Sequence, residues 1–201
     1  GRSNDVNHYR FTAADMDNLQ TRGGRTRLLT FSNDLSEAEI AYVASGEEKS
    51  INERYLLRKR SPWYSMERRP AAPIWALVFT RAGARFVRND ASALSLTNFH
   101  AVYPVEDDPI YHDALACVLN SELVAHAAQA HWRRYGGGLT KFEPADLLAM
   151  PVPDMTRLGS ETIADLAALF KRLDERSRHG DSQSPIQKEV KNLLTSSHVG
   201  I

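Results

Sequence analysis

The hydrophobic period of the chain changes near its centre, and this change narrows the folds that it can adopt. Residues 74–79 (IWALVF) form a short apolar run of strand-forming side chains, bounded by Pro73 and by the turn signal Ala82-Gly83. Residues 85–88 (RFVR) then alternate polar and apolar side chains, which predicts a hairpin around Gly83. Residues 94–105 indicate a further extended segment. Together these segments predict a small mixed or antiparallel sheet.

Helical patterns flank this centre on its N-terminal side. Thr12 and Ser36 are each followed three positions later by an acidic residue, Asp15 and Glu39, which is the capping-box pattern that begins a helix. The first helix is expected over residues 12–20. The second should stop near Gly46, because glycine commonly ends a helix.

The C-terminal side is helical as well. The spacing of apolar residues predicts a helix over residues 111–135, which the run Gly136-Gly137-Gly138 should end. It also predicts helices over about 160–176 and 185–195, the second begun by a capping box at 184–187. The fold class is therefore α/β, of the α+β kind: a small sheet flanked by helices, with a C-terminal helical hairpin. We expect a domain over residues 1–155 and a helical extension over 156–201.

Composition excludes several classes of protein. The 25 basic and 25 acidic residues cancel, which taken alone argues against a general polyanion binder. No apolar stretch reaches 18 residues and no signal-peptide pattern is present, so we expect no membrane partner. Cys117 is the only cysteine, which rules out an internal disulfide and fits a cytoplasmic location.

The motifs of common catalysts are missing. The sequence has no GxxxxGK[ST], no GxGxxG after a strand and no G-x-S-x-G. Cys117 lies within a helical pattern and is interpreted as a small buried side chain. His126 and His131 are five residues apart, which does not place both on one face of a helix, so no metal site is expected. We assign no catalytic residue.

Positive charge is concentrated in one region. Between Arg54 and Arg88 many basic residues occur and Glu67 is the only acidic one, which suggests a localised anionic partner or a solvated arginine-rich surface. Trp75, Phe79 and Phe86 are expected in the core. For Trp63 and Tyr64, which adjoin the basic cluster, a place in the core and a place at a binding surface both stay open.

Four stretches in a fixed order carry a family resemblance. They are RSPWYSMERRPAAPIWALVFTR, RFVRNDASALSLTNFHAVYP, LACVLNSELV and RRYGGGLTKFEPADLLAMPVPD. Over roughly residues 55–155 the chain resembles the C-terminal target-recognition region of adenine-specific DNA methyltransferases of restriction–modification systems, of the TaqI-like and Eco57I-like kind.

The resemblance implies a division of labour. Such enzymes have an N-terminal domain that binds S-adenosylmethionine and holds the flipped adenine with an NPPY-type motif, while the C-terminal domain lies on the DNA. Neither the glycine-rich motif for the cofactor nor the NPPY-type motif occurs here. The implied partners are thus double-stranded DNA and an N-terminal methyltransferase domain of the same polypeptide. The cofactor is expected in that missing domain, and residues 1–155 would be the target-recognition domain.

Arginine suits phosphates and guanine edges because its planar fork donates two parallel hydrogen bonds. Glycine lets a backbone approach closely. The predicted DNA contacts are Arg58, Lys59, Arg60, Arg68 and Arg69, with Trp63 and Tyr64 shaping their surface; Arg81, Arg85 and Arg88 on the hairpin; and Arg133, Arg134, Tyr135, Gly136, Gly137 and Lys141 in the glycine-rich loop.

Two alternatives remain at this point. The arginine-rich face could bind an acidic protein partner, which predicts no DNA binding. Alternatively, scattered histidines and carboxylates could form an active site, which predicts a pocket with perturbed titratable groups.

Overall fold

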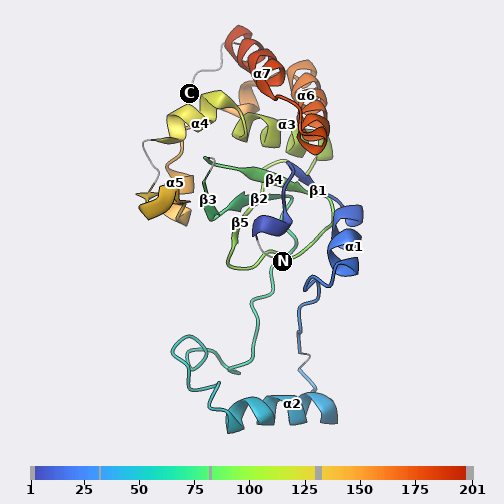
Figure 1. The fold of residues 1–201 in the computed structure, drawn as a ribbon, viewed down its shortest axis with the longest axis vertical. Helices are drawn as coiled ribbons and strands as arrows, with labels where there is room; N and C mark the ends of the chain where they lie inside the picture. Colours follow the sequence, from blue (N-terminus) through green and yellow to red (C-terminus); the bar gives the residue numbers. More distant parts are fainter. Residues whose placement is uncertain (1–2, 32, 82, 130–132, 198–201) are drawn as a thin grey trace. The chain divides into compact units, whose positions relative to one another are not determined.

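The computed structural model describes residues 3–31, 33–81, 83–129 and 133–197 (Figure 1). The chain forms two compact units: a main unit of Gly1–Arg25 with Ala71–Ile201, and an inserted unit of Thr26–Pro70. No boundary falls at the expected residue 155. The reason is that α6 (Ser160–His179) packs along α3 (Pro109–Leu119) and shares its core, so the C-terminal helices belong to the main unit.

A mixed four-stranded sheet lies at the centre of the main unit, in the order β1-β4-β2-β5. β2 (Ile74–Leu77) pairs antiparallel with β4 (Phe86–Asn89) and with β5 (Phe99–Val102). β1 (Arg10–Phe11) adds a parallel pair at the edge of β4. The predicted fold class and the antiparallel pairing across Gly83 are confirmed.

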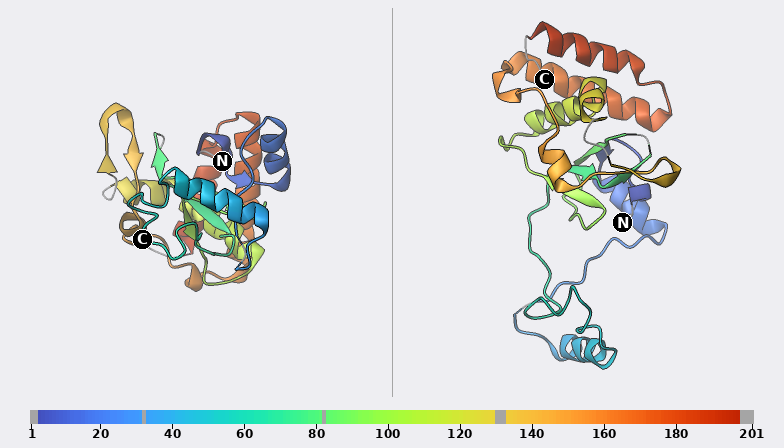
Figure 2. Two further views of the ribbon diagram at one scale, coloured as in Figure 1. Left: turned by 90° about the horizontal axis from the view of Figure 1, so that it is seen from below. Right: turned by 90° about the vertical axis from the view of Figure 1, so that its left-hand side faces the viewer.

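The sheet is buried on both faces because the side chains of β2 alternate between two cores. Ile74 and Ala76 face the core shared with the C-terminal helices, whereas Trp75 and Leu77 face a smaller core with Phe11. In Figure 2, α6 and α7 (Ser184–Ser196) stack over α3 on one side of the sheet.

A second sheet, of three short strands in the order β3-β7-β6, departs from expectation. β3 (Phe79–Thr80) leaves the central sheet and pairs with β7 (Thr140–Lys141), which pairs in turn with β6 (Arg133–Arg134). Phe79 is therefore exposed rather than part of the core, while the expected burial of Trp75 and Phe86 is confirmed.

The single helix predicted over residues 111–135 is wrong. The chain forms α3, a break, and then α4 (Glu122–Ala128), while residues 130–132, with His131, lie outside the described part. The break follows from side-chain capping. Asn120 caps the end of α3, and the Ser121 hydroxyl accepts a hydrogen bond from the Val124 N–H at the start of α4. The glycine run is instead the 3-10 turn η3 (Gly136–Gly138) between β6 and β7.

Helix starts on the N-terminal side agree with the capping boxes. α1 (Ala13–Thr21) and α2 (Glu37–Glu48) begin at Thr12 and Ser36, and both boxes are formed. The short elements η1 (Ser3–Asp5), α5 (Pro144–Leu148) and η4 (Met155–Arg157) complete the chain.

The C-terminal hairpin of α6 and α7 is present, with one correction. The N-cap of α7 is Gln183, and no side chain caps it, so the capping box expected at Ser184 does not form. Leu166, Phe170 and Leu173 of α6 share a core with the apolar stripe of α7. None of the helices described is long and apolar enough to cross a membrane.

Candidate nucleic-acid interface

Trp63 and Tyr64 hold the inserted unit together. A Cβ atom at Gly46 of α2 would lie 2.7 Å from the Trp63 ring, so the indole sits directly on the helix backbone. The indole Nε1 donates a hydrogen bond of 3.0 Å to Glu47, and Tyr64 packs edge-on against Trp63 and Phe31. Of the two readings that the sequence left open, the structure favours packing, since both rings are half-buried against other side chains.

The contact with Trp63 also explains the glycine at position 46 of α2. The helix was expected to stop near Gly46, and this is confirmed, since α2 ends at Glu48; Gly46 itself lies in the last turn of α2. Glycine is required there because the indole occupies the space of a side chain.

Two of the predicted cations, Arg58 and Lys59, lie against the exposed ring of Tyr55. Lys59 Nζ lies 4.1 Å from the centroid of the Tyr55 ring and donates to its hydroxyl at 2.8 Å, while Arg58 Cζ lies 5.3 Å from the same centroid. The ring itself is 61% exposed. Neither cation forms an ion pair with any described residue. We call Tyr55, Arg58 and Lys59 the Tyr55 cluster.

No sequence motif singles out Tyr55. Its spacing of three and four residues from Arg58 and Lys59 is the available signal, because such spacings bring side chains together in helical turns. Tight turns do occur here, with hydrogen bonds from Leu57 N and Arg58 N to Arg54 O.

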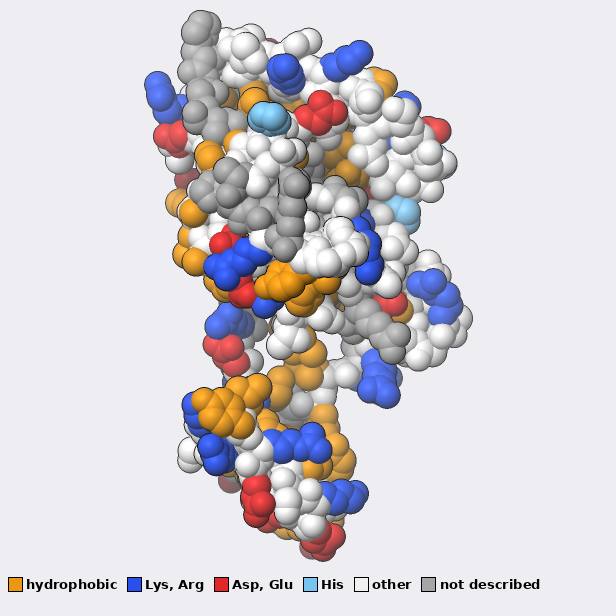
Figure 3. Space-filling view, turned by 60° about the vertical axis from the view of Figure 1, so that its left-hand side comes forward, with side chains coloured by type: hydrophobic (Ala, Val, Ile, Leu, Met, Phe, Trp, Pro, Cys, Tyr) orange, Lys and Arg blue, Asp and Glu red, His pale blue; other side chains and the backbone are white. Residues whose placement is uncertain are grey.

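The other predicted cations of this unit are exposed but engaged locally. Arg60 donates to the carbonyl of Ser65 at 3.0 Å, and Arg68 donates to that of Phe31 at 3.3 Å. Arg69 is paired with Glu67. Figure 3 shows Lys and Arg side chains beside hydrophobic ones on this unit.

In the main unit, the β6–β7 hairpin presents cations that have carboxylate partners. Arg133 pairs with Asp146 at 3.2 Å, and Lys141 pairs with Glu143 at 2.5 Å. The hydrogen bond with Glu143 raises the pKa of Lys141 and lowers that of the carboxyl group. The hairpin is thus less positive than its basic residues alone suggest. Arg134 lies in β6, and its side chain is outside the described part.

The tip of the hairpin is open. Tyr135 is half exposed, and its backbone N–H donates to Leu139 O at 2.7 Å. Gly137 has a φ of 70°, which favours glycine. Gly136 has no such constraint, and no atom lies within 4 Å of a Cβ placed there. The absence of a side chain at Gly136 therefore has no explanation within the domain.

Arg88 is not available to DNA. It is 8% exposed, and its guanidinium contacts Asp113 at 3.1 Å, Asp90 at 3.3 Å and the carbonyl of Pro73 at 3.0 Å. Its position in β4, against α3, buries it. We therefore do not place Arg88 in the interface.

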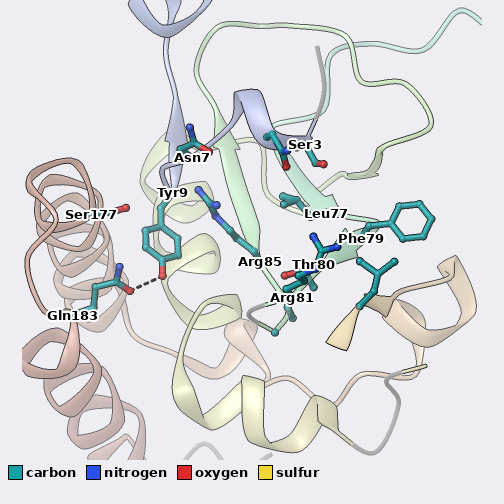
Figure 4. Close-up of a pocket in the computed structure, with 14 residues that line it drawn as sticks. Ser3, Asn7, Tyr9, Leu77, Phe79, Thr80, Arg81, Arg85, Ser177 and Gln183 are labelled. Atoms are coloured by element: carbon teal, nitrogen blue, oxygen red, sulfur yellow. Dashed lines mark hydrogen bonds between the residues drawn. The ribbon is translucent and has the colours of Figure 1, made fainter. Parts of the chain in front are cut away.

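Arg81 and Arg85 line a pocket of the main unit (Figure 4). Arg81 is exposed. Arg85 is half-buried; it donates to the carbonyl of His8 at 2.7 Å and lies over the ring of Tyr9, and burial lowers its pKa.

Comparison with known proteins identifies the kind of domain. The family described as "Type II methyltransferase M.Eco57I, C-terminal domain" matches residues 1–194. The chain belongs to this family. The C-terminal domain is 31% identical, over 190 residues, to Type II methyltransferase M.AccI of Acinetobacter calcoaceticus, with 94% of the chain and 35% of that protein covered.

A second relative is more distant. Type II methyltransferase M.XamI of Xanthomonas campestris pv. amaranthicola is 28% identical over 133 residues, which are 66% of this chain and 25% of that protein. The C-terminal domain therefore spans about a third or less of the curated relatives that it matches. The resemblance predicted over residues 55–155 is confirmed and covers nearly the whole chain.

The described residues do not fit a cofactor of methyl transfer. S-adenosylmethionine, which the resemblance implies for the catalytic domain, would need a glycine-rich loop that follows a strand and begins a helix, whereas Gly136–Gly138 lies between the strands β6 and β7. Among the described residues, no three His, Cys, Asp or Glu side chains are placed to hold a metal ion. No step of methyl transfer is therefore assigned to this domain.

Proposed function

We propose that this C-terminal domain binds duplex DNA and selects the target sequence for an N6-adenine methyltransferase of a restriction–modification system. The catalytic part, with its S-adenosylmethionine, would lie elsewhere in the same polypeptide. The family membership supports a role in a Type II methyltransferase. The observation that carries the proposal is the Tyr55 cluster, in which two exposed cations, neither paired with a carboxylate of the described residues, flank an exposed ring.

The physical basis is electrostatic. Each cation that neutralises a DNA phosphate releases a counterion, which supplies much of the binding free energy. An adenine inside the duplex must be extruded before it can be methylated, at a cost of a few kcal/mol. Contacts to the phosphates and to neighbouring bases offset that cost. A free pair such as Arg58 and Lys59 suits this role better than cations already paired within the domain.

The other predicted DNA contacts differ in the partners that they have within the domain. Arg68 bonds to the backbone carbonyl of Phe31, and Arg60 bonds to that of Ser65 and to the neutral sulfur of Met66, so both keep their charge for a phosphate. Arg69 would have to exchange the exposed carboxylate of Glu67 for a phosphate, and exposed ion pairs contribute little. Arg133 and Lys141 would have to leave the half-buried carboxylates of Asp146 and Glu143.

The test is a duplex titration of the intact protein that contains this domain, over a series of salt concentrations. The double variant R58Q/K59Q should reduce the slope of log K against log salt by about 1–2. The matched control is K171Q/K188Q, which removes two exposed lysines from α6 and α7. Equal slopes for both variants and the wild type would remove the Tyr55 cluster from the interface.

A docking role is the second candidate. The inserted unit exposes Ile40 and Tyr42 on α2, which would suit a protein surface such as the catalytic domain. This role predicts that substitution of Ile40 and Tyr42 by serine weakens association with a separately produced catalytic domain. It also predicts that duplex affinity does not respond to R58Q/K59Q.

A further inference from the structure

The pocket beside Arg85 has an unusual charge balance. It measures about 420 Å³ and lies between the N-terminal segment, strands β2 and β3, and the α6–α7 turn. Its described lining has two arginines, Arg81 and Arg85, and several neutral polar side chains, but no Asp or Glu. A second pocket of similar size, about 410 Å³, contains both signs of charge, from Arg10, Arg22, Asp5 and Asp15.

The charge of Arg85 is held without an ion pair to any described residue. One hydrogen bond to the carbonyl of His8 uses Nη2, and the ring of Tyr9 supports the guanidinium at 5.7 Å. Burial favours the neutral form, but arginine remains protonated at neutral pH. The pocket therefore contains a partly desolvated positive charge with several donors free for a ligand.

Asp174 acts on the charge of Arg85 from a distance, but its carboxylate is already bound by other groups. The Asp174 carboxylate accepts hydrogen bonds from the backbone N–H of Arg10 at 2.8 Å and from Nε of Arg178 at 2.7 Å. Its charge is thus shared mainly with Arg178.

Neutral donors and acceptors surround the guanidinium. The Tyr9 hydroxyl donates to Gln183 at 2.6 Å, and this pair closes one side of the pocket (Figure 4). Asn7 and Ser177 complete this side. Such a setting, with arginines and uncharged polar groups, is suited to a phosphate, whose oxygens accept paired hydrogen bonds from the guanidinium fork.

We propose that this pocket binds a phosphate group of the DNA backbone, with Arg85 as the half-buried anchor and Arg81 at the rim. The pocket wall includes Phe79 and Thr80 of β3, which pairs with β7 of the glycine-tipped hairpin. A duplex that contacts the hairpin would thus bring a phosphate to the pocket. The choice of DNA as the source rests on the proposed function, since a free nucleotide has the same phosphate chemistry.

The experiment uses the intact protein with R85Q, R85K and R81Q, and with R157Q as a control on an exposed arginine of η4. We expect R85Q to weaken duplex binding about tenfold, as for loss of a charge-assisted hydrogen bond, and to reduce the salt slope by about 0.9. R85K should restore part of the slope because it keeps the charge. Thermal midpoints identify any variant that fails to fold, in which case the exposed Arg81 provides the test.

A second measurement locates the phosphate. A series of duplexes, each with one neutral methylphosphonate, should contain a position that weakens the wild type and leaves R85Q unaffected. If the wild type binds with a steep salt dependence while R85Q and R81Q behave like R157Q, the pocket proposal is overturned and the proposed function stands.

Titration with inorganic phosphate and with adenosine monophosphate shows whether the bound phosphate belongs to DNA or to a free nucleotide. If the wild type does not bind duplex DNA, the proposed function fails and so does DNA as the source. Binding of adenosine monophosphate that R85Q abolishes would then support the phosphate site with a free nucleotide as its ligand. The absence of any phosphate binding would overturn the site itself.

Discussion

Asn120 lies in the stretch LACVLNSELV, which carries part of the family resemblance. Its substitution tests directly whether this side chain stabilises the fold or contacts DNA. An asparagine can pair with an adenine edge, but here the side chain is bound to the backbone of Phe86. Its Oδ1 accepts from the Phe86 N–H at 3.0 Å, and its Nδ2 donates to the Phe86 carbonyl at 2.8 Å and to that of Ala116 at 2.8 Å. Phe86 is 2% exposed, so water can replace these bonds only in part.

The expected loss of unfolding free energy follows from the two backbone groups of Phe86 that Asn120→Ala would leave unpaired. Each buried backbone group without a partner costs about 1–3 kcal/mol. Asn120 is only half-buried, so some water will enter, and we expect the free energy of unfolding to fall by about 2–4 kcal/mol. Asn120→Asp keeps the acceptor but loses the donor, and should also destabilise the domain.

The assay is urea unfolding, with Asn18→Ala on the exposed face of α1 as the control, for which we expect a change within about 0.5 kcal/mol. DNA affinity of the folded protein should stay unchanged in Asn120→Ala. The reasoning is refuted if the variant unfolds at the same urea concentration as the wild type, or if it retains full stability and loses sequence selectivity.

Three further predictions concern acid stability, the hairpin tip and the buried thiol. Burial opposes ionisation of Asp15, but hydrogen bonds from Arg178 and Thr12 outweigh it and lower its pKa from 3.8 to about 2. Because the folded-state pKa is depressed, the ionised Asp15 stabilises the fold above about pH 4, and this contribution is lost as the pH falls towards 2. After discounting for solvent exposure the contribution is about 1 kcal/mol. Asp15→Asn should therefore flatten the acid limb of a curve of unfolding free energy against pH. Gly136→Ala should leave the melting temperature unchanged or slightly raised yet weaken duplex binding, whereas Gly137→Ala, at a φ of 70°, should cost about 1 kcal/mol; unchanged affinity in Gly136→Ala would show that the tip does not contact DNA. Burial raises the pKa of Cys117 to about 12, so iodoacetamide at pH 8 should alkylate it only after unfolding, and rapid labelling of the native protein would contradict its placement.

Some features of the fold follow from interactions within a few residues. The helix starts at Thr12 and Ser36 follow from side chains that bond to backbone three positions away. The strand at Ile74–Leu77 follows from a compact apolar run between turn signals. The family resemblance likewise depends on the order of short stretches, so it was readable from the sequence.

The candidate site was predictable only in part, because arginines of the same local pattern meet different partners. Arg58 stays exposed beside Tyr55, whereas Arg88 is buried against Asp113, which lies 25 residues further along the chain. Nothing near Arg88 in the sequence indicates this ion pair. The same applies to Trp63, whose packing partner Gly46 belongs to a separate helix.

The sequence by itself therefore determined the fold class, the capped N-terminal helices, the central strand and the kind of enzyme to which the domain belongs. The tertiary structure alone decided which cations remain free, where the helix breaks at Asn120, and that Tyr9, Arg85 and Gln183 meet around one pocket. The reason is physical: caps and strand patterns depend on near neighbours, whereas burial and ion pairing depend on segments that only folding brings together.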